Sequence, residues 1–260
     1  MLLENKTAII YGGGGGIGGG VARAFAREGA AVYLAGRNLE PMEPVAAEIT
    51  AAGGTAEMAV LDATDERAVD DHADVVASKA GGIDVSFNLI SRGDVQRIPL
   101  IDMATDDLLR AVVTGLTSNF ITARAAARRM VERRSGVILH LNSASGAGAM
   151  PGMGSTGPAD AATESFMRYL AAEVGPQGVR VVGIHTAGVV ETLTQAGLDE
   201  VGGEGTPDPE TVERMIAGMA MLRRAPRLAQ VADAAAFLAS DRASGMTATM
   251  ANVTCGLVPG

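Results

Sequence analysis

A run of glycines near the N-terminus constrains the fold of this chain more than any other feature. Eight of the nine residues between Tyr11 and Val21 are glycine, and the ninth is Ile17. The run follows an apolar segment, residues 7–11, and precedes a stretch whose apolar residues recur every four positions. A strand, a glycine loop and a helix in this order bring backbone N–H groups close to a phosphate at the helix N-terminus. The sequence therefore predicts a nucleotide pyrophosphate as the ligand of this loop.

A flexible low-complexity segment would have the same glycine-rich composition, so the flanking residues decide between the two interpretations. The strand and helix patterns on either side favour the phosphate loop. Glycine permits close backbone approach and positive φ angles in such a loop, but within a helix it costs roughly 0.5–1 kcal/mol relative to alanine. Because Gly19 and Gly20 fall in the first helical turn, we expect that turn to be soft until a ligand orders it.

Apolar, β-branched runs alternate with helical patterns along all 260 residues. Strands are expected at residues 7–11, 31–35, 56–61, 83–90, 136–142, 179–185 and 247–253. Helices are expected at residues 17–28, 40–52, 66–80, 105–133, 158–174, 211–223 and 228–239. This alternation predicts a single α/β domain over residues 1–260, a Rossmann-type, doubly wound parallel sheet of about seven strands with helices on both faces. Ligands of such a sheet bind beyond the C-terminal ends of its strands.

The charge balance and the cysteine count exclude several classes of partner. A formal net charge of −9 argues against nucleic acid or an anionic membrane. The apolar runs are too short to cross a bilayer, and the first residues lack a signal-peptide pattern. Cys255 is the only cysteine, which excludes an internal disulfide and fits a reducing cytosol, so we expect a cytoplasmic protein without a metal site. One basic cluster is expected to form a solvated helix face: Arg124, Arg128, Arg129, Arg133 and Arg134.

The residues that follow the predicted strands indicate which nucleotide binds. Arg37 follows the second strand, where an acidic residue would bind a ribose 2′-hydroxyl and an arginine accommodates a 2′-phosphate. This position favours NADP(H) over NAD(H), although an exposed loop arginine is the alternative. Asp62, after the third strand, is placed to accept a hydrogen bond from an adenine amino group. Asn88 comes after the fourth strand.

Together these positions resemble the short-chain dehydrogenase/reductase family over essentially the whole chain. The family's Thr-Gly-x-x-x-Gly-Ile-Gly loop appears as residues 11–18, with Tyr11 in place of the threonine. Its Asn-Asn-Ala-Gly motif appears as residues 88–91, where only the first asparagine is kept. Its Pro-Gly-x-x-x-Thr segment, which grips the nicotinamide amide in the family, appears as residues 187–192. The resemblance implies a cofactor site that includes Gly12, Gly16, Ile17, Gly18, Asn88, Gly188 and Thr192.

The catalytic motif of the family is not kept. In the family, the fifth strand ends in a serine, a tyrosine follows thirteen residues later, and a lysine follows four residues beyond the tyrosine. Counted from Ser143, those two positions hold Thr156 and Asp160, and the position of the fourth helix's asparagine holds Gly115. The enoyl-reductase branch uses a wider tyrosine-to-lysine spacing, but no lysine follows Lys79, so the residues argue against that branch too. Of the family's four catalytic residues, only the serine remains.

Asp160 could take over part of the missing chemistry. A desolvated carboxyl stays protonated closer to neutral pH and can act as an acid, with Ser143 orienting the substrate oxygen. If ionised, Asp160 would instead stabilise the oxidised nicotinamide cation. The alternative is an aspartate that caps or solvates the start of the fifth helix. Thr156 carries a much weaker acid than tyrosine, and His185, at the end of the sixth strand, is the best alternative base.

Residues 193–225 are expected to form a lid over an apolar substrate, although ordinary helix packing explains its methionines almost as well. Two hypotheses for the function of the chain follow from these residues. The first is an NADP(H)-dependent oxidoreductase that acts on a small ketone or alcohol through a rearranged proton relay. The alternative is a cofactor-binding pseudoenzyme or a non-redox enzyme, such as a cyclase or dehydratase. A structural partner that needs no nucleotide ranks behind both. The family resemblance also implies a homo-oligomer, a tetramer or dimer built through the fourth and fifth helices.

Overall fold

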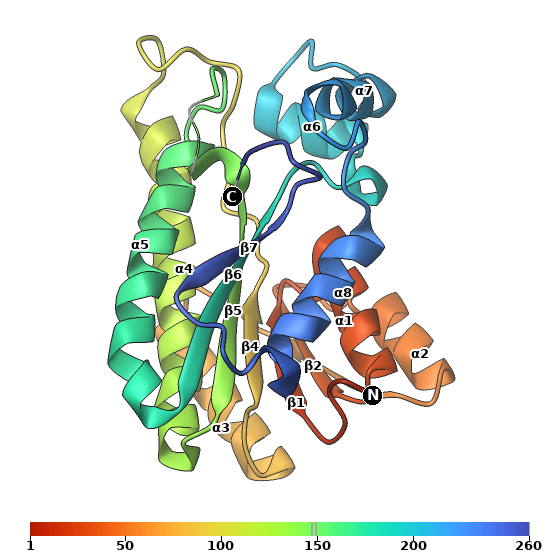
Figure 1. Ribbon diagram of the computed structural model, residues 1–260, viewed down its shortest axis with the longest axis vertical. Helices are drawn as coiled ribbons and strands as arrows, with labels where there is room; N and C mark the ends of the chain where they lie inside the picture. The colour runs from red at the N-terminus through yellow and green to blue at the C-terminus, as the bar shows by residue number, and fades with distance from the viewer. Residues whose placement is uncertain (147, 149, 260) are drawn as a thin grey trace.

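A seven-stranded parallel sheet forms the centre of the molecule, with the strand order β3-β2-β1-β4-β5-β6-β7 (Figure 1). The computed structural model describes residues 1–146, 148 and 150–259. The strands are β1 (Thr7–Tyr11), β2 (Ala31–Gly36), β3 (Thr55–Val60), β4 (Val85–Asn88), β5 (Gly136–Ser143), β6 (Val179–Thr186) and β7 (Thr249–Val253). The predicted doubly wound, Rossmann-type parallel sheet is therefore confirmed.

Helices cover both faces of this sheet, as Figure 1 shows. One face packs against α1 (Gly16–Arg27), α2 (Glu43–Ala51) and α8 (Leu228–Ala239). The other face packs against α3 (Glu66–Ala80), α4 (Thr105–Arg133) and α5 (Thr156–Val174). Two further helices, α6 (Gln195–Gly202) and α7 (Pro209–Met219), appear at the top right of Figure 1.

The central strand β1 shows why a continuous apolar run is needed for this architecture. Ala8 and Ile10 point into the core under α1 and α8, whereas Ile9 and Tyr11 point into the core under α3 and α4. Successive side chains of a strand point to opposite faces, and here both faces are covered by helices. Every residue of β1 is therefore buried.

Two elements differ from those predicted. β4 pairs with β1 only from Val85 to Asn88, because the chain leaves the ladder at the next residue and passes the glycine loop. The segment 193–225, expected to form a lid and called the lid segment below, contains a helix, α6, that the sequence pattern does not indicate. Its eight residues include two glycines, so its apolar period is too short to recognise, and Thr194 caps its start by accepting a hydrogen bond from the Gly197 N–H at 3.1 Å.

The prediction of a solvated arginine face on α4 holds for Arg128, Arg133 and Arg134, which are exposed, but not for Arg124 and Arg129. Arg129 is only 15% exposed and pairs with both Asp70 and Asp74 on α3. Arginine combines a long side chain with several donors, and one helix can therefore engage carboxylates on its neighbour. The remaining pairs to α3 and to the loop before β4 are Arg124–Glu66, Arg128–Asp70 and Arg133–Asp84. The cluster thus joins α4 to its neighbours through ion pairs, while three of its five arginines also face water.

None of the helices within the described part of the chain has both the length and the apolar character that crossing a bilayer requires.

Candidate active site

The glycine loop lies between β1 and α1, at the C-terminal edge of the sheet. Gly12 has a φ of +78°, a conformation that favours glycine, and a β-carbon there would collide with the Leu89 carbonyl group. A β-carbon on Gly18 would overlap the Gly12 carbonyl oxygen. Gly15 precedes α1 as its N-cap residue, so the loop presents backbone N–H groups at the start of that helix. This geometry fits the predicted pyrophosphate loop.

Four further glycines of the run are closely packed. Each of them lies against a different neighbour, and a β-carbon would fall within 3 Å of that neighbour's side chain: Gly13 against Leu34, Gly14 against Pro41, Gly16 against Thr192 and Gly20 against Leu228. Steric crowding therefore explains much of the glycine excess. That the first turn of α1 is soft without a ligand stays a prediction.

A cleft of about 400 Å³ opens beside the loop. It is lined by Gly12, Gly14, Gly15, Arg37, Asn38, Asp62, Thr64, Leu89, Ile90, Ser91 and Thr114, among others. Asp62 accepts hydrogen bonds from the Thr64 N–H at 2.8 Å and from Thr64 Oγ1 at 2.7 Å. These bonds hold the pKa of the Asp62 carboxyl below its usual range. The cleft thus combines a phosphate loop, an arginine and an ionised carboxylate at the place where the sequence predicts the adenosine half of a dinucleotide.

Residues assigned to the nicotinamide half lie farther along the same edge. Asn88 donates from Nδ2 to Ser118 Oγ at 3.1 Å and accepts from the Ile90 N–H at 3.2 Å, so its side chain fixes the turn after β4. The segment after β6 passes between the glycine loop and α7: Thr192 packs against Gly16, and Gly188 faces Ile216. The structure therefore brings Gly188 and Thr192 close to the loop that carries Gly12, Gly16, Ile17 and Gly18.

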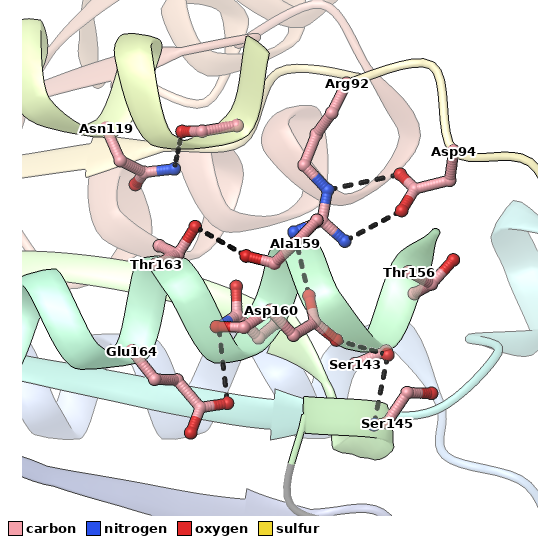
Figure 2. Close-up of polar contacts among 12 residues, drawn as sticks. Arg92, Asp94, Asn119, Ser143, Ser145, Thr156, Ala159, Asp160, Thr163 and Glu164 are labelled. Atoms are coloured by element: carbon pink, nitrogen blue, oxygen red, sulfur yellow. Dashed lines mark hydrogen bonds and ion pairs between the residues drawn. The ribbon is translucent and has the colours of Figure 1, made fainter. Parts of the chain in front are cut away.

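Ser143 and Asp160 form the central polar contact of the candidate site, drawn in Figure 2. Ser143 ends β5, and its Oγ donates to Asp160 Oδ2 at 2.6 Å. Asp160 belongs to the second turn of α5, which begins at Thr156 with Ser155 as its N-cap residue. The alternative that Asp160 caps or solvates this helix start is wrong, because its side chain has no exposed surface and points to Ser143.

Burial sets the protonation of Asp160. Removal from water favours the neutral acid and raises the pKa of its carboxyl from 3.8 to about 6, even though the Arg92 guanidinium and the Ser143 hydroxyl favour the ionised form. A carboxyl with this pKa is mostly ionised at neutral pH and still takes up a proton readily. Such a group can serve as a base or as an acid.

Arg92 completes this cluster and was not among the candidates from sequence. Its Nη1 lies 2.8 Å from Asp160 Oδ1, while Nε and Nη2 donate to the two oxygens of Asp94 at 3.1 and 3.0 Å. Figure 2 shows the guanidinium between the two carboxylates. A weak signal existed in the sequence, since Arg92 lies in the loop after the fourth strand, at the edge where ligands of such sheets bind. No sequence pattern around Arg92 indicates that it pairs with Asp160.

Thr156, predicted to stand at the position of the family's tyrosine, has a hydroxyl oxygen that already accepts a hydrogen bond. Gln96 Nε2 donates to Thr156 Oγ1 at 3.0 Å, and Thr156 is only 4% exposed. The neighbouring Arg97 and the Gln96 backbone hold the end of α6. The Gln96 N–H donates to the Val201 carbonyl at 2.8 Å, and Arg97 Nη1 donates to Thr206 Oγ1 at 2.8 Å. Residues 92–97, which we term the connecting loop, thus contact Asp160, Thr156 and the lid.

His185 is placed apart from this cluster. Its Nε2 lies 2.8 Å from Glu164 Oε1 in a buried pair between β6 and α5. Burial works against the charge on Glu164, but the contacts with His185, Asn142 and His140 together outweigh burial, so the pKa of Glu164 lies below the usual range. Asn142 Nδ2 bridges the Asp160 carbonyl oxygen and Glu164 Oε1 at 3.1 and 3.3 Å. The structure thus unites Ser143 with Asp160, and pairs His185 with Glu164.

The lid segment presents its methionines to the surface. Met215, Met219 and Met221 are 55%, 51% and 69% exposed, so packing within the chain does not account for them. Flexible, polarizable methionine side chains adapt to apolar surfaces of varied shape. The exposed methionines leave apolar surface available on α7 and the residues that follow it.

Comparison with known proteins agrees with this geometry. The chain matches the family model described as enoyl-(acyl carrier protein) reductase over residues 13–258. It is 34% identical to tropinone reductase-like 2 of Erythroxylum coca over 93% of this chain and 86% of that protein. It is 30% identical to the 3-oxoacyl-(acyl-carrier-protein) reductase FabG of Chlamydia muridarum over 98% of each. The crystal structure of NAD+-bound xylitol dehydrogenase matches it with a TM-score of 0.87 and 27% identity, covering 98% of this chain and all of that one.

The chain belongs to the family of that model, and with it to the short-chain dehydrogenase/reductases, which bind the nucleotide cofactors NAD(P)(H) and act on small molecules. The model's description names an enoyl reductase, an activity against which the residues argue. Membership establishes the fold and the family; that Thr156 and Asp160 stand at the positions of the family's tyrosine and lysine remains a prediction from the count that starts at Ser143.

Proposed function

We propose that this protein is an NADP(H)-dependent oxidoreductase that interconverts a small, largely apolar alcohol and its ketone, with Ser143 and Asp160 as the proton relay. The observation that carries this proposal is the 2.6 Å hydrogen bond from Ser143 Oγ to Asp160 Oδ2 at the end of β5. In this proposal the Ser143 hydroxyl, hydrogen-bonded to the titratable Asp160 carboxyl, takes over the role of the missing tyrosine and lysine.

The cofactor assignment is supported by the cleft and its charge. The loop from Gly12 to Gly15 would hold the pyrophosphate. Asp62 would accept a hydrogen bond from the adenine amino group. Arg37, exposed beside the cleft, is placed to bind a ribose 2′-phosphate, which favours NADP(H). Gly188 and Thr192 would contact the nicotinamide amide. When bound, the nicotinamide supplies the hydride chemistry.

Proton transfer in this proposal uses two oxygen atoms of the chain. During alcohol oxidation, the substrate hydroxyl gives its proton to Ser143 Oγ while the serine's own proton passes to Asp160 Oδ2. Asp160 is suited to this role, because a pKa of about 6 leaves it ionised at neutral pH. In carbonyl reduction, the proton moves back along the same path. Thr156 is not given the role of proton donor in this proposal, because a threonine hydroxyl is a far weaker acid than tyrosine and this one is buried.

The names of the relatives support a carbonyl or alcohol as the reacting group, since they include a tropinone reductase-like protein and a xylitol dehydrogenase. The exposed methionines near α7 favour an apolar substrate body. A single cysteine, Cys255, fits a reducing compartment such as the cytoplasm.

A screen of NADP+ reduction and NADPH oxidation against a panel of alcohols and ketones tests the proposal. Ser143→Ala and Asp160→Asn should each lower kcat/KM roughly 10²- to 10⁴-fold, the contribution of a positioned acid or base. Ser244→Ala and Asp102→Asn, at exposed positions away from the cluster, are the matched controls. Unchanged turnover in both relay variants would rule out Ser143 and Asp160 as the proton relay. A decrease of the same size in the kcat/KM of His185→Ala would make His185 the better candidate for the base.

A second candidate function, cofactor binding without hydride transfer or a non-redox reaction such as cyclisation or dehydration, has one observation in its favour. The tyrosine position holds a buried threonine that Gln96 already occupies. NADPH at a hundred times its Kd should stabilise either kind of protein by about 2.7 kcal/mol. Stabilisation without hydride transfer to any carbonyl of the panel would favour this second candidate. A chain that neither NADPH nor NADH stabilises would be a structural protein.

The outer surface of α4 and α5 supports assembly into a homodimer or homotetramer. Phe120 is 42% exposed and Tyr169 is 72% exposed, and Phe120 stacks edge-to-face on Phe166 with ring centroids 5.7 Å apart. The small residues Ala162 and Ser165 line the same surface hollow as these rings. Light scattering should report a dimer or tetramer, and Ala162→Arg should shift it toward the monomer.

A further inference from the structure

We infer that Arg92 is the positioning residue of the proton relay: it fixes the Asp160 carboxylate so that one oxygen is left for Ser143, and it supplies the positive charge that the site lacks without the family's lysine. This inference rests on the proposed relay of Ser143 and Asp160. Arg92 itself does not touch the reacting atoms and acts through Asp160.

The first support is the division of the donors of Arg92. Nε and Nη2 are both taken by Asp94, which holds the planar guanidinium in one orientation. Nη1 is left to meet Asp160 Oδ1 at 2.8 Å. Asp160 Oδ2 is then the oxygen that remains for the Ser143 hydroxyl. Figure 2 shows this sequence of contacts from Asp94 through Arg92 and Asp160 to Ser143.

The second support is the space in which Arg92 lies. A β-carbon added to Gly115 on α4 would fall 2.7 Å from Arg92 Cδ. Any side chain larger than glycine at position 115 would therefore force Arg92 to move. The arginine runs through the volume that the family's asparagine would need, so the replacement at position 115 and the path of Arg92 belong together.

The third support is the charge around Asp160. The connecting loop brings Arg92 and Asp94, β5 brings the uncharged Ser143 and Asn142, and α4 brings Gly115. On α5 itself, Glu164 follows one turn later and is occupied by His185. Within the part of the chain that the structure describes, Arg92 is thus the cation in direct contact with the buried carboxylate. Without it, Asp160 would share its surroundings with Asp94 and Glu164, which are both acidic.

An infrared titration of the full-length protein tests the inference without relying on turnover. The protonated carboxyl band of Asp160, assigned by its loss in Asp160→Asn, should have its midpoint near pH 6 in the parent. In Arg92→Met the midpoint should rise by about 1–3 pH units, the usual effect of a neighbouring arginine on an aspartate. Arg92→Lys, which keeps the charge, should bring the midpoint back toward that of the parent. Arg110→Met, an exposed arginine paired with Asp107, should leave the midpoint unchanged.

The outcomes separate this inference from the proposed function. A folded Arg92→Met variant with an unmoved midpoint overturns the inference, whether or not the parent is active. A raised midpoint in a protein without hydride transfer supports the role of Arg92 and contradicts the proposed function. If Arg92→Met does not fold, Gly115→Ala displaces the guanidinium and keeps its charge, and the midpoint should again rise. In an active parent, the pH profile of kcat/KM should move by the same amount as the infrared midpoint.

Discussion

Arg92 passes through the space that a side chain at Gly115 would fill, with its Cδ 2.7 Å from the position of the absent β-carbon. Two changes that look separate in the sequence, a glycine on α4 and an arginine in the connecting loop, are therefore one structural arrangement. Because Arg92 in turn pairs with Asp160, the aspartate at the predicted lysine position belongs to the same arrangement. If one of these residues is changed to the family's type, the other two no longer fit the space or the charge around it.

This arrangement predicts the outcome of restoring the family's residues. Thr156→Tyr combined with Asp160→Lys should gain little carbonyl reduction, because the new lysine would face the like charge of Arg92. Adding Arg92→Ala and Gly115→Asn removes that charge and returns the asparagine, and the rate should then rise at least about 10²-fold over the double variant, the lower range for a positioned acid. NADPH oxidation on the ketone panel measures both. A double variant as active as the quadruple one would contradict the coupling.

Asp160 should make folding stability depend on pH. Its folded-state pKa of about 6 exceeds the ordinary value of 3.8, so the folded protein binds this proton more tightly than the unfolded chain. The stability that the group contributes is complete below the unfolded pKa and is lost as pH rises through about 6. At 1.36 kcal/mol for each pKa unit, the loss is about 3 kcal/mol.

Urea unfolding of the parent and of Asp160→Asn, between about pH 4 and about pH 7.5, measures this linkage. The free energy of unfolding of the parent, relative to that of the variant, should fall across this window. The comparison cancels the other titrating groups, including Glu164 and His185, since both proteins contain them. A constant difference between the two proteins would show that burial does not raise the pKa of Asp160.

Arg37 should determine the choice between the two dinucleotides. Arg37→Ala should weaken NADPH binding roughly tenfold to a hundredfold, the worth of a hydrogen bond to a charged group, and leave NADH binding nearly unchanged. Calorimetric titration of both nucleotides measures the ratio. Arg27→Ala, an exposed arginine at the C-terminal end of α1 that pairs with Asp233, is the control. Equal losses of affinity for NADPH and NADH would rule out a contact between Arg37 and the 2′-phosphate.

The glycine run should contain positions that tolerate no methyl group. Gly18→Ala should destabilise the fold by about 1–3 kcal/mol, as overpacking does, because the added β-carbon would overlap the Gly12 carbonyl oxygen. Gly218→Ala near the end of α7 meets nothing within 4 Å and should stabilise by roughly 0.5–1 kcal/mol. Thermal unfolding of the two variants gives the comparison. A harmless Gly18→Ala substitution would mean that the loop shifts freely.

The strands and helices followed from the sequence because their signals are local. The apolar run of β1 and the regular period of α4 predict these elements with the bounds that the structure shows, Thr7–Tyr11 and Thr105–Arg133. The cofactor loop was predictable for the same reason, since its glycines are consecutive. By contrast, the α4 arginines were assigned to solvent, because periodicity identifies a helix face but not the element that packs against it.

The candidate site was predictable only in part. Counting from Ser143 brought Asp160 into consideration, and the structure shows the two in contact. The contact of Arg92 with Asp160 joins a loop and a helix that are far apart in the chain, and it depends on the space left at Gly115. No local pattern carries that information. His185 was singled out because it lies near a strand end, but the side to which its ring points, and hence its pairing with Glu164, depends on the packing of α5.

The connecting loop, residues 92–97, has a mechanical consequence. Its first residue holds Asp160, and its last two hold the end of α6 through the Gln96 N–H and the Arg97 side chain. A displacement of α6 would therefore act on the same short loop that carries Arg92. We expect a substitution that only loosens α6 to change the position of Arg92 and, through it, the surroundings of the Asp160 carboxylate.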